Sequence, residues 1–134
     1  MKLPQGFRSA SIAAGLKSTG ALDLTVIENQ GPNFTASAVF TTNKVVAAPV
    51  MWSRQVAKGG SVRAAVLNSG GANACTGPQG FADTHETAEK VGELLGVSAG
   101  EVVVCSTGLI GELLPMPKIL AGLELIAANL KTDS

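Results

Sequence analysis

Aromatic side chains are scarce in this sequence: of its 134 residues, four are Phe, one is Trp and none is Tyr. A hydrophobic core therefore has to be assembled from Ala, Val, Leu and Ile, whose individual gains on burial are smaller than those of large rings. The apolar content of 46% still suffices for one core, because a compact chain of this size buries roughly two thirds of its unfolded surface. We expect a single globular domain.

No charge of one sign predominates, since ten basic and ten acidic residues cancel and are scattered along the chain. This excludes the electrostatic footprint of proteins that bind DNA, RNA or anionic lipid, so we expect a small-molecule or protein partner. No apolar run approaches the length of a membrane span, and residues 1–8 lack the apolar segment of a secretory signal. We therefore expect a cytoplasmic protein without nucleic-acid or membrane partners.

Cysteine and histidine are also rare: the sequence contains two cysteines, Cys75 and Cys105, and one histidine, His85. They form no cluster at metal-ligand spacing, so we expect neither a bound metal nor a bound cofactor. Two cysteines without a secretory signal are more typical of buried thiols than of a disulfide. His85 is expected to be a partly buried structural residue, because no Asp or Asn is placed by the sequence to orient it as a catalytic base.

The first half of the chain predicts short strands. Apolar and polar residues alternate over 22–28, and after a turn the pattern resumes over 34–41, which predicts a hairpin. Residues 45–51 are apolar but include Pro49, which favours an edge strand or an irregular crossing. Residues 53–58 are expected to form a short helix that ends at two glycines.

The second half predicts alternating strands and helices. Compact apolar runs predict strands over 62–67 and from 102 onward. Apolar residues at helical spacing predict a helix of about four turns that ends before Gly96. A second apolar stripe predicts a helix over 116–130, with Pro115 and Pro117 in its first turn. The whole pattern indicates one α/β domain, with a mixed sheet and packed helices, over residues 1–134.

The most informative segment is VVVCSTGLIG at residues 102–111, where an apolar run stops at a small polar turn. The Thr107 hydroxyl and the Gly108 N–H are suited to bind the oxyanion of an acyl-transfer intermediate. The alternative is an ordinary strand-to-turn junction, in which Ser106 and Thr107 satisfy local backbone groups and Gly108 supplies an unusual dihedral angle. Residue types alone favour this alternative.

A second segment of small residues, NSGGANACTG, occupies residues 68–77. Its glycines allow backbone N–H groups to approach an anion or a substrate. The alternative is a tight turn that Asn68 and Asn73 hold together by hydrogen bonds. The glycine spacing matches neither the phosphate-loop nor the dinucleotide fingerprint, so nucleotide binding is poorly supported.

With these motifs the chain closely resembles the N-terminal part of the ornithine acetyltransferase family, the bifunctional glutamate N-acetyltransferases of arginine biosynthesis. The resemblance covers nearly the whole chain in family order, and two of its segments are long enough to be specific. The matching segments are GFR at 6–8, AGLK at 14–17, AVFTTN at 38–43, AAPV at 47–50, NSGGANACTG at 68–77, CSTGLIG at 105–111 and LPM at 114–116.

The resemblance implies a precursor that cleaves itself before a threonine, which becomes the N-terminal nucleophile of a second, C-terminal (beta) chain. Such enzymes move an acetyl group from N-acetylornithine to glutamate, and some members also accept it from acetyl-CoA. The family's oxyanion pair maps onto Thr107 and Gly108, so the resemblance favours the oxyanion hole over the strand-end alternative. It also implies an assembly of two alpha and two beta chains.

The family's cleavage threonine and two further motifs lie beyond Ser134. We therefore expect residues 1–134 to be an incomplete N-terminal portion of a longer self-cleaving precursor, inactive alone because it supplies an oxyanion hole without the nucleophile. The competing interpretation is a non-catalytic truncated remnant, or a small interaction domain that retains the scaffold.

Overall fold

The structure is a computed structural model that describes residues 2–132. Met1, Asp133 and Ser134 of the expected 1–134 domain lie outside the described residues. Within residues 2–132, four strands form one sheet in the order β1-β2-β3-β4. The antiparallel pairs are β1 with β2 and β2 with β3, whereas β3 and β4 are parallel. The strands are β1 Phe7–Ile12, β2 Leu24–Asn29, β3 Ala64–Gly71 and β4 Val102–Leu109.

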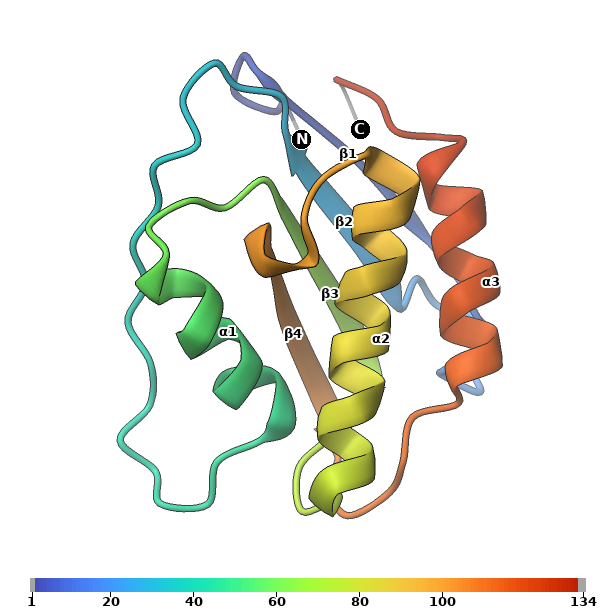
Figure 1. The fold of residues 1–134 in the computed structure, drawn as a ribbon. Coiled ribbons are helices and arrows are strands. Elements are labelled where there is room, and N and C mark those ends of the chain that lie inside the picture. Colours follow the sequence, from blue (N-terminus) through green and yellow to red (C-terminus); the bar gives the residue numbers. More distant parts are fainter. Residues whose placement is uncertain (1, 133–134) are drawn as a thin grey trace.

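The α-helices of the described part of the chain lie on one side of this sheet (Figure 1). Helix α3 packs on β1 and β2, α2 packs on β3 and β4, and α1 packs beside β4. The mixed sheet with packed helices confirms the expected α/β fold. None of the described helices is long and apolar enough to cross a membrane. The helices are α1 Ala48–Lys58, α2 Gly77–Leu95, the 3₁₀ turn η1 Ala99–Glu101 and α3 Met116–Ala127.

The core lies between the sheet and the helices, and its buried members are aliphatic, as the composition predicts. Its residues come from strands β2, β3 and β4, from helices α2 and α3, and from the segment before α3. The larger side chains from α3 fill the space over β1 and β2. The buried core consists of Leu24, Val26, Ala64, Val66, Ala88, Val91, Val102, Val104, Leu114, Ile119, Leu123 and Ile126.

The predicted hairpin between residues 22–28 and 34–41 is wrong. Strand β2 pairs with β1 and β3 instead, and the second segment contributes only one isolated bridge. The side chains of Asn33, Thr41 and Asn43 each accept a hydrogen bond from the backbone N–H two residues further on. Such local bonds compete with a strand ladder, and this segment runs as an irregular connection to α1.

The edge strand predicted around Pro49 is also wrong, because α1 begins at Ala48. Proline is tolerated in the first helical turn, where its missing N–H has no intrahelical acceptor. The predicted helix over 53–58 is therefore the second half of a longer one, and it ends before Gly59 as expected.

Helix α2 is longer than predicted, with 19 residues and hence about five turns. Its end is confirmed: Gly96 adopts the left-handed conformation, with φ of 69°. The second half of the helix faces the core with the apolar stripe that the sequence suggested, whereas its first turns bury small and polar residues. Its buried residues are Gly80, Asp83, Thr84, Thr87, Ala88, Val91 and Gly92.

Candidate functional site

The two glycine-containing motifs meet at the carboxyl ends of β3 and β4. Because these strands are parallel neighbours, the register places Ser69 opposite Thr107 and Gly70 opposite Gly108. Residues 106–108 are therefore still part of β4, and the predicted turn begins after them, at residue 110. The pairing holds the Thr107–Gly108 segment more firmly than a free turn would.

Thr107 lies on the face of the sheet that the helices leave open. Side chains alternate along β4, so buried Val102 and Val104 face the helices while Cys105 and Thr107 are exposed on the opposite side. There the Thr107 side chain contributes to a surface pocket with residues of β2 and β3. The pocket is lined by Leu22, Asp23, Thr25, Leu67, Asn68, Ser69, Cys105, Ser106 and Thr107.

Gly108 has to be glycine for two reasons. Its φ of 133° belongs to a region that side-chain-bearing residues rarely adopt. A Cβ at this position would also lie 2.5 Å from the carbonyl carbon of Gly70 and 2.6 Å from the nitrogen of Gly71. The two strand ends are thus in direct backbone contact, which fixes the position of the Gly108 peptide against β3.

Asparagine side chains organise the turn between β3 and α2. The Asn68 amide donates to the Gly71 carbonyl at 3.1 Å, and the Ser106 hydroxyl donates to Asn68 Oδ1 at 2.5 Å. Asn73 is fully buried; its amide donates to the Gly80 carbonyl and to the Thr84 hydroxyl, both at 2.9 Å. These contacts match the alternative in which the two asparagines hold a tight turn together.

Helix α1 covers the free edge of β4 through side-chain hydrogen bonds. The buried Ser53 hydroxyl donates to the Val104 carbonyl at 3.0 Å and accepts from the Val104 N–H at 2.9 Å. Trp52 Nε1 donates to the Val102 carbonyl at 2.9 Å. Backbone groups that would be unpaired at a sheet edge are thereby satisfied.

Sequence reasoning missed Asp23, which lines the same pocket as Thr107, with Ser69 of β3 between the two residues. Asp23 is 4% exposed, and its oxygens accept backbone N–H groups from Ala14, Leu16 and Lys17 at 2.7 to 3.0 Å. Burial opposes ionisation, but these N–H groups outweigh it and hold the pKa of Asp23 below its usual value. No spacing rule signals this contact, because it depends on how the β1–β2 connection folds back.

The expectation of buried thiols is wrong, since both Cys75 and Cys105 are solvent-accessible and free. Partial burial raises the pKa of the Cys105 thiol, which disfavours the nucleophilic thiolate. His85 is also more exposed than expected: 48% of its side chain is accessible, its ring stacks on Trp52, and its Nε2 lies 3.0 Å from Glu89. Within residues 2–132, no group of three His, Cys, Asp or Glu side chains is arranged to hold a metal ion.

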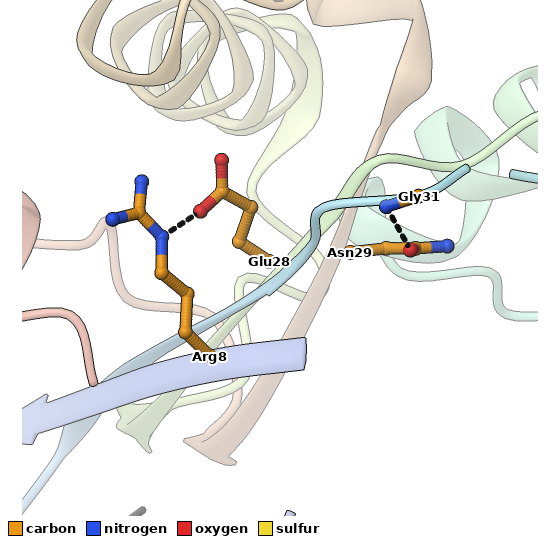
Figure 2. Close-up of polar contacts among 4 residues, drawn as sticks. All are labelled: Arg8, Glu28, Asn29 and Gly31. Carbon is orange, nitrogen blue, oxygen red and sulfur yellow. Dashed lines mark hydrogen bonds and ion pairs between the residues drawn. The ribbon is translucent and has the colours of Figure 1, made fainter. Parts of the chain in front are cut away.

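Two arginine side chains make structural contacts near the sheet. Arg8 on β1 pairs with Glu28, which lies directly opposite on β2 and is largely buried (Figure 2). The same figure shows Asn29, whose side-chain oxygen accepts the Gly31 N–H at 2.8 Å and fixes the exit from β2. Arg63 lies over the Phe34 ring with its guanidinium 4.1 Å from the ring centre.

Comparison with known proteins gives consistent matches over almost the whole chain. Residues 8–134 match the ArgJ family. The arginine biosynthesis bifunctional protein ArgJ of Streptomyces coelicolor is 61% identical over 126 residues, which are 94% of this chain and 33% of that protein. The Mycobacterium tuberculosis protein of the same name is 60% identical over 124 residues. The chain thus spans about a third of the length of these relatives.

Solved structures of the same family match this chain as well. A crystal structure of ornithine acetyltransferase from Mycobacterium tuberculosis, complexed with ornithine, superposes with a TM-score of 0.96 at 54% identity. The match covers 98% of this chain and 70% of that chain. The ArgJ protein of Bacillus halodurans superposes with a TM-score of 0.83 at 38% identity, over 89% of this chain and 62% of that one. The chain belongs to the ArgJ family.

Proposed function

We propose that residues 1–134 are the alpha-chain region of a glutamate N-acetyltransferase that moves an acetyl group from N-acetylornithine to glutamate in arginine biosynthesis, with acetyl-CoA as an alternative donor. The observation that carries this proposal is the TM-score of 0.96 with the ornithine-bound enzyme of Mycobacterium tuberculosis. The identity of 61% with a bifunctional arginine biosynthesis protein supports the same activity.

Within this reaction, Thr107 and Gly108 form the oxyanion hole. The Thr107 side chain is accessible on the open face of the sheet. Peptide groups alternate in direction along a strand: the Val104 N–H points to the sheet edge, where it meets Ser53, whereas the Leu109 carbonyl points to the β3 side, where it accepts from Ala72. This alternation directs the Gly108 N–H to the edge, which supports its use as a donor to substrate rather than to the ladder.

The nucleophile comes from a C-terminal beta chain that the same precursor releases by self-cleavage. Its N-terminal threonine hydroxyl attacks the acetyl carbonyl of N-acetylornithine, and its α-amino group or a neighbouring group takes the proton. Thr107 and Gly108 donate to the tetrahedral oxyanion, which collapses to an acetyl-threonine ester and releases the ornithine amine. The glutamate amine then attacks the ester and loses a proton, so that the ester C–O bond breaks, N-acetylglutamate forms and the threonine hydroxyl is regenerated. Two alpha and two beta chains assemble in the cytoplasm.

The test is a hybrid precursor in which residues 1–134 replace the matching third of the Streptomyces coelicolor relative. We expect acetyl transfer from N-acetylornithine to glutamate, measured as N-acetylglutamate formed. Thr107→Val removes one preorganised donor and lowers kcat about a hundredfold or more. Thr107→Ser keeps the hydroxyl and retains most of the activity.

Thr132→Val is the matched control, because Thr132 is exposed and follows Lys131, which bonds to strand β1 at the opposite edge of the sheet. It should leave kcat unchanged. If Thr107→Val turns over as fast as this control, the oxyanion role is wrong. If the hybrid matures but transfers no acetyl group, the non-catalytic alternative is favoured instead.

A further inference from the structure

We propose that Asp23 is a positioning residue for the oxyanion hole: through the loop that its carboxylate folds it fixes the Gly108 peptide, and through its own backbone carbonyl it holds Ser69, the β3 partner of Thr107. This inference rests on the proposed function. Asp23 itself does not act on the substrate.

The Asp23 carboxylate organises the loop between β1 and β2. One Asp23 oxygen accepts the Ala14 N–H at 2.7 Å, and the other accepts the N–H groups of Leu16 and Lys17 at 2.7 and 3.0 Å. The Asp23 N–H in turn donates to the carbonyl of Ile12 at 3.0 Å. A single buried side chain thereby sets the path of residues 14–17.

This loop contacts the end of strand β3. A Cβ at Gly70 would lie 2.9 Å from the Leu16 carbonyl oxygen, so the loop backbone rests directly on Gly70. Gly70 in turn touches Gly108, whose Cβ position is 2.5 Å from the Gly70 carbonyl carbon. Three backbone segments are therefore stacked without intervening side chains. A shift of the loop toward Gly70 would therefore press on Gly70 and, through it, on Gly108.

A separate contact leads from Asp23 to Thr107. The Asp23 carbonyl accepts the Ser69 N–H at 2.9 Å, and Ser69 is the register partner of Thr107. Both residues line the same pocket as the Asp23 side chain. The two donors of the oxyanion hole are thus tied to one residue by independent routes.

The ionised form of Asp23 is the one that this geometry needs. A carboxylate accepts three N–H groups at once, whereas the amide of Asn turns a donor toward one of them. The lowered pKa keeps the side chain ionised at neutral pH. Because oxyanion stabilisation depends on donor placement to a fraction of an ångström, loosening the loop should reduce transition-state binding rather than substrate binding.

The experiment compares Asp23→Asn with Asp83→Asn in the hybrid enzyme. Asp83 is a matched control: it is 5% exposed, its carboxylate accepts one amide from Gln79, and it lies on α2 away from the loop. For Asp23→Asn we expect kcat to fall by about tenfold to a hundredfold with KM for N-acetylornithine unchanged. Asp83→Asn should alter kcat by less than about twofold, although it removes the same buried charge.

A structural readout separates this inference from the proposed function. In ¹⁵N–¹H spectra of the 134-residue chain, Asp23→Asn should shift the amide resonances of Gly70 and Gly108, whereas Asp83→Asn should leave them in place. If the shifts occur while Thr107→Val leaves turnover intact, the coupling stands and the catalytic proposal fails. If Thr107→Val is damaging while Asp23→Asn leaves kcat or the Gly108 resonance unmoved, the positioning role is refuted.

A second variant covers the case in which Asp23→Asn does not fold. Lys118 is exposed on α3, and its Nζ donates to the Gly15 carbonyl at 3.2 Å, which holds the same loop from outside. Lys118→Met removes this bond without burying a charge. We expect a two- to fivefold loss of kcat, scaled down from the tenfold loss above because one exposed bond is removed, again at constant KM. A kcat equal to that of the unaltered enzyme would overturn the proposal.

Discussion

Replacing Gly108 by Ala is the sharpest test of the backbone contact between β3 and β4. The new Cβ would lie 2.5, 2.6 and 2.8 Å from backbone atoms of Gly70 and Gly71, which cannot move aside as a flexible side chain would. Overpacking of this kind costs about 1–3 kcal/mol. The φ of 133° adds about 1–3 kcal/mol of strain for a residue with a side chain. We expect Gly108→Ala to lower the free energy of unfolding by about 4 kcal/mol.

The matched control is Gly60→Ala. Gly60 also has a positive φ, of 71°, but a Cβ there meets no atom within 4 Å. Only the left-handed conformation is penalised, at about 1–2 kcal/mol. Urea unfolding of the 134-residue chain, followed by circular dichroism, measures both variants. With a slope of about 2 kcal/mol per molar, their midpoints should differ by about 1 M or more. Equal midpoints would refute the claim that close backbone contact fixes Gly108.

Two further predictions concern the surroundings of the site. Ser53→Ala leaves the buried N–H and carbonyl of Val104 without their partner, which should lower the free energy of unfolding in urea by about 2–4 kcal/mol. Ser53→Thr keeps the hydroxyl and should lower it less. An equal loss in both variants would show that packing, and not the hydrogen bonds, is responsible. Because the folded pKa of Asp23 is lowered, its contribution to stability is fully present above the unfolded pKa of about 3.9 and is lost as the pH falls through the folded pKa. The difference in unfolding free energy between the unaltered chain and Asp23→Asn should therefore shrink below about pH 4, and a difference that stays constant down to pH 3 would contradict the ionised state.

Local sequence patterns predicted an element correctly where its residues favour one kind of secondary structure over the others. The β-branched run at 102–104 predicted β4, and the apolar stripe from 116 onward predicted α3. Gly96 ended α2 because a left-handed residue is needed there. Prediction failed where a residue type serves two structures. Pro49 fits both an edge strand and a first helical turn, and only the packing of α1 along β4 selects the helix.

For the site, too, the sequence predicted some features and packing decided others. The segments at 68–77 and 105–111 are recognisable from their small residues. Their resemblance to the family points to Thr107 and Gly108 as the oxyanion pair, and this role stays a prediction. The sequence alone also determined the fold class and an aliphatic core. Only the tertiary structure decided that the two segments meet, that Ser53 completes the edge of β4, and that Asp23 folds a loop onto Gly70. The physical reason is that period and propensity act over a few neighbouring residues, whereas these contacts join groups that the chain brings together only when the parallel pair and its connections are in place.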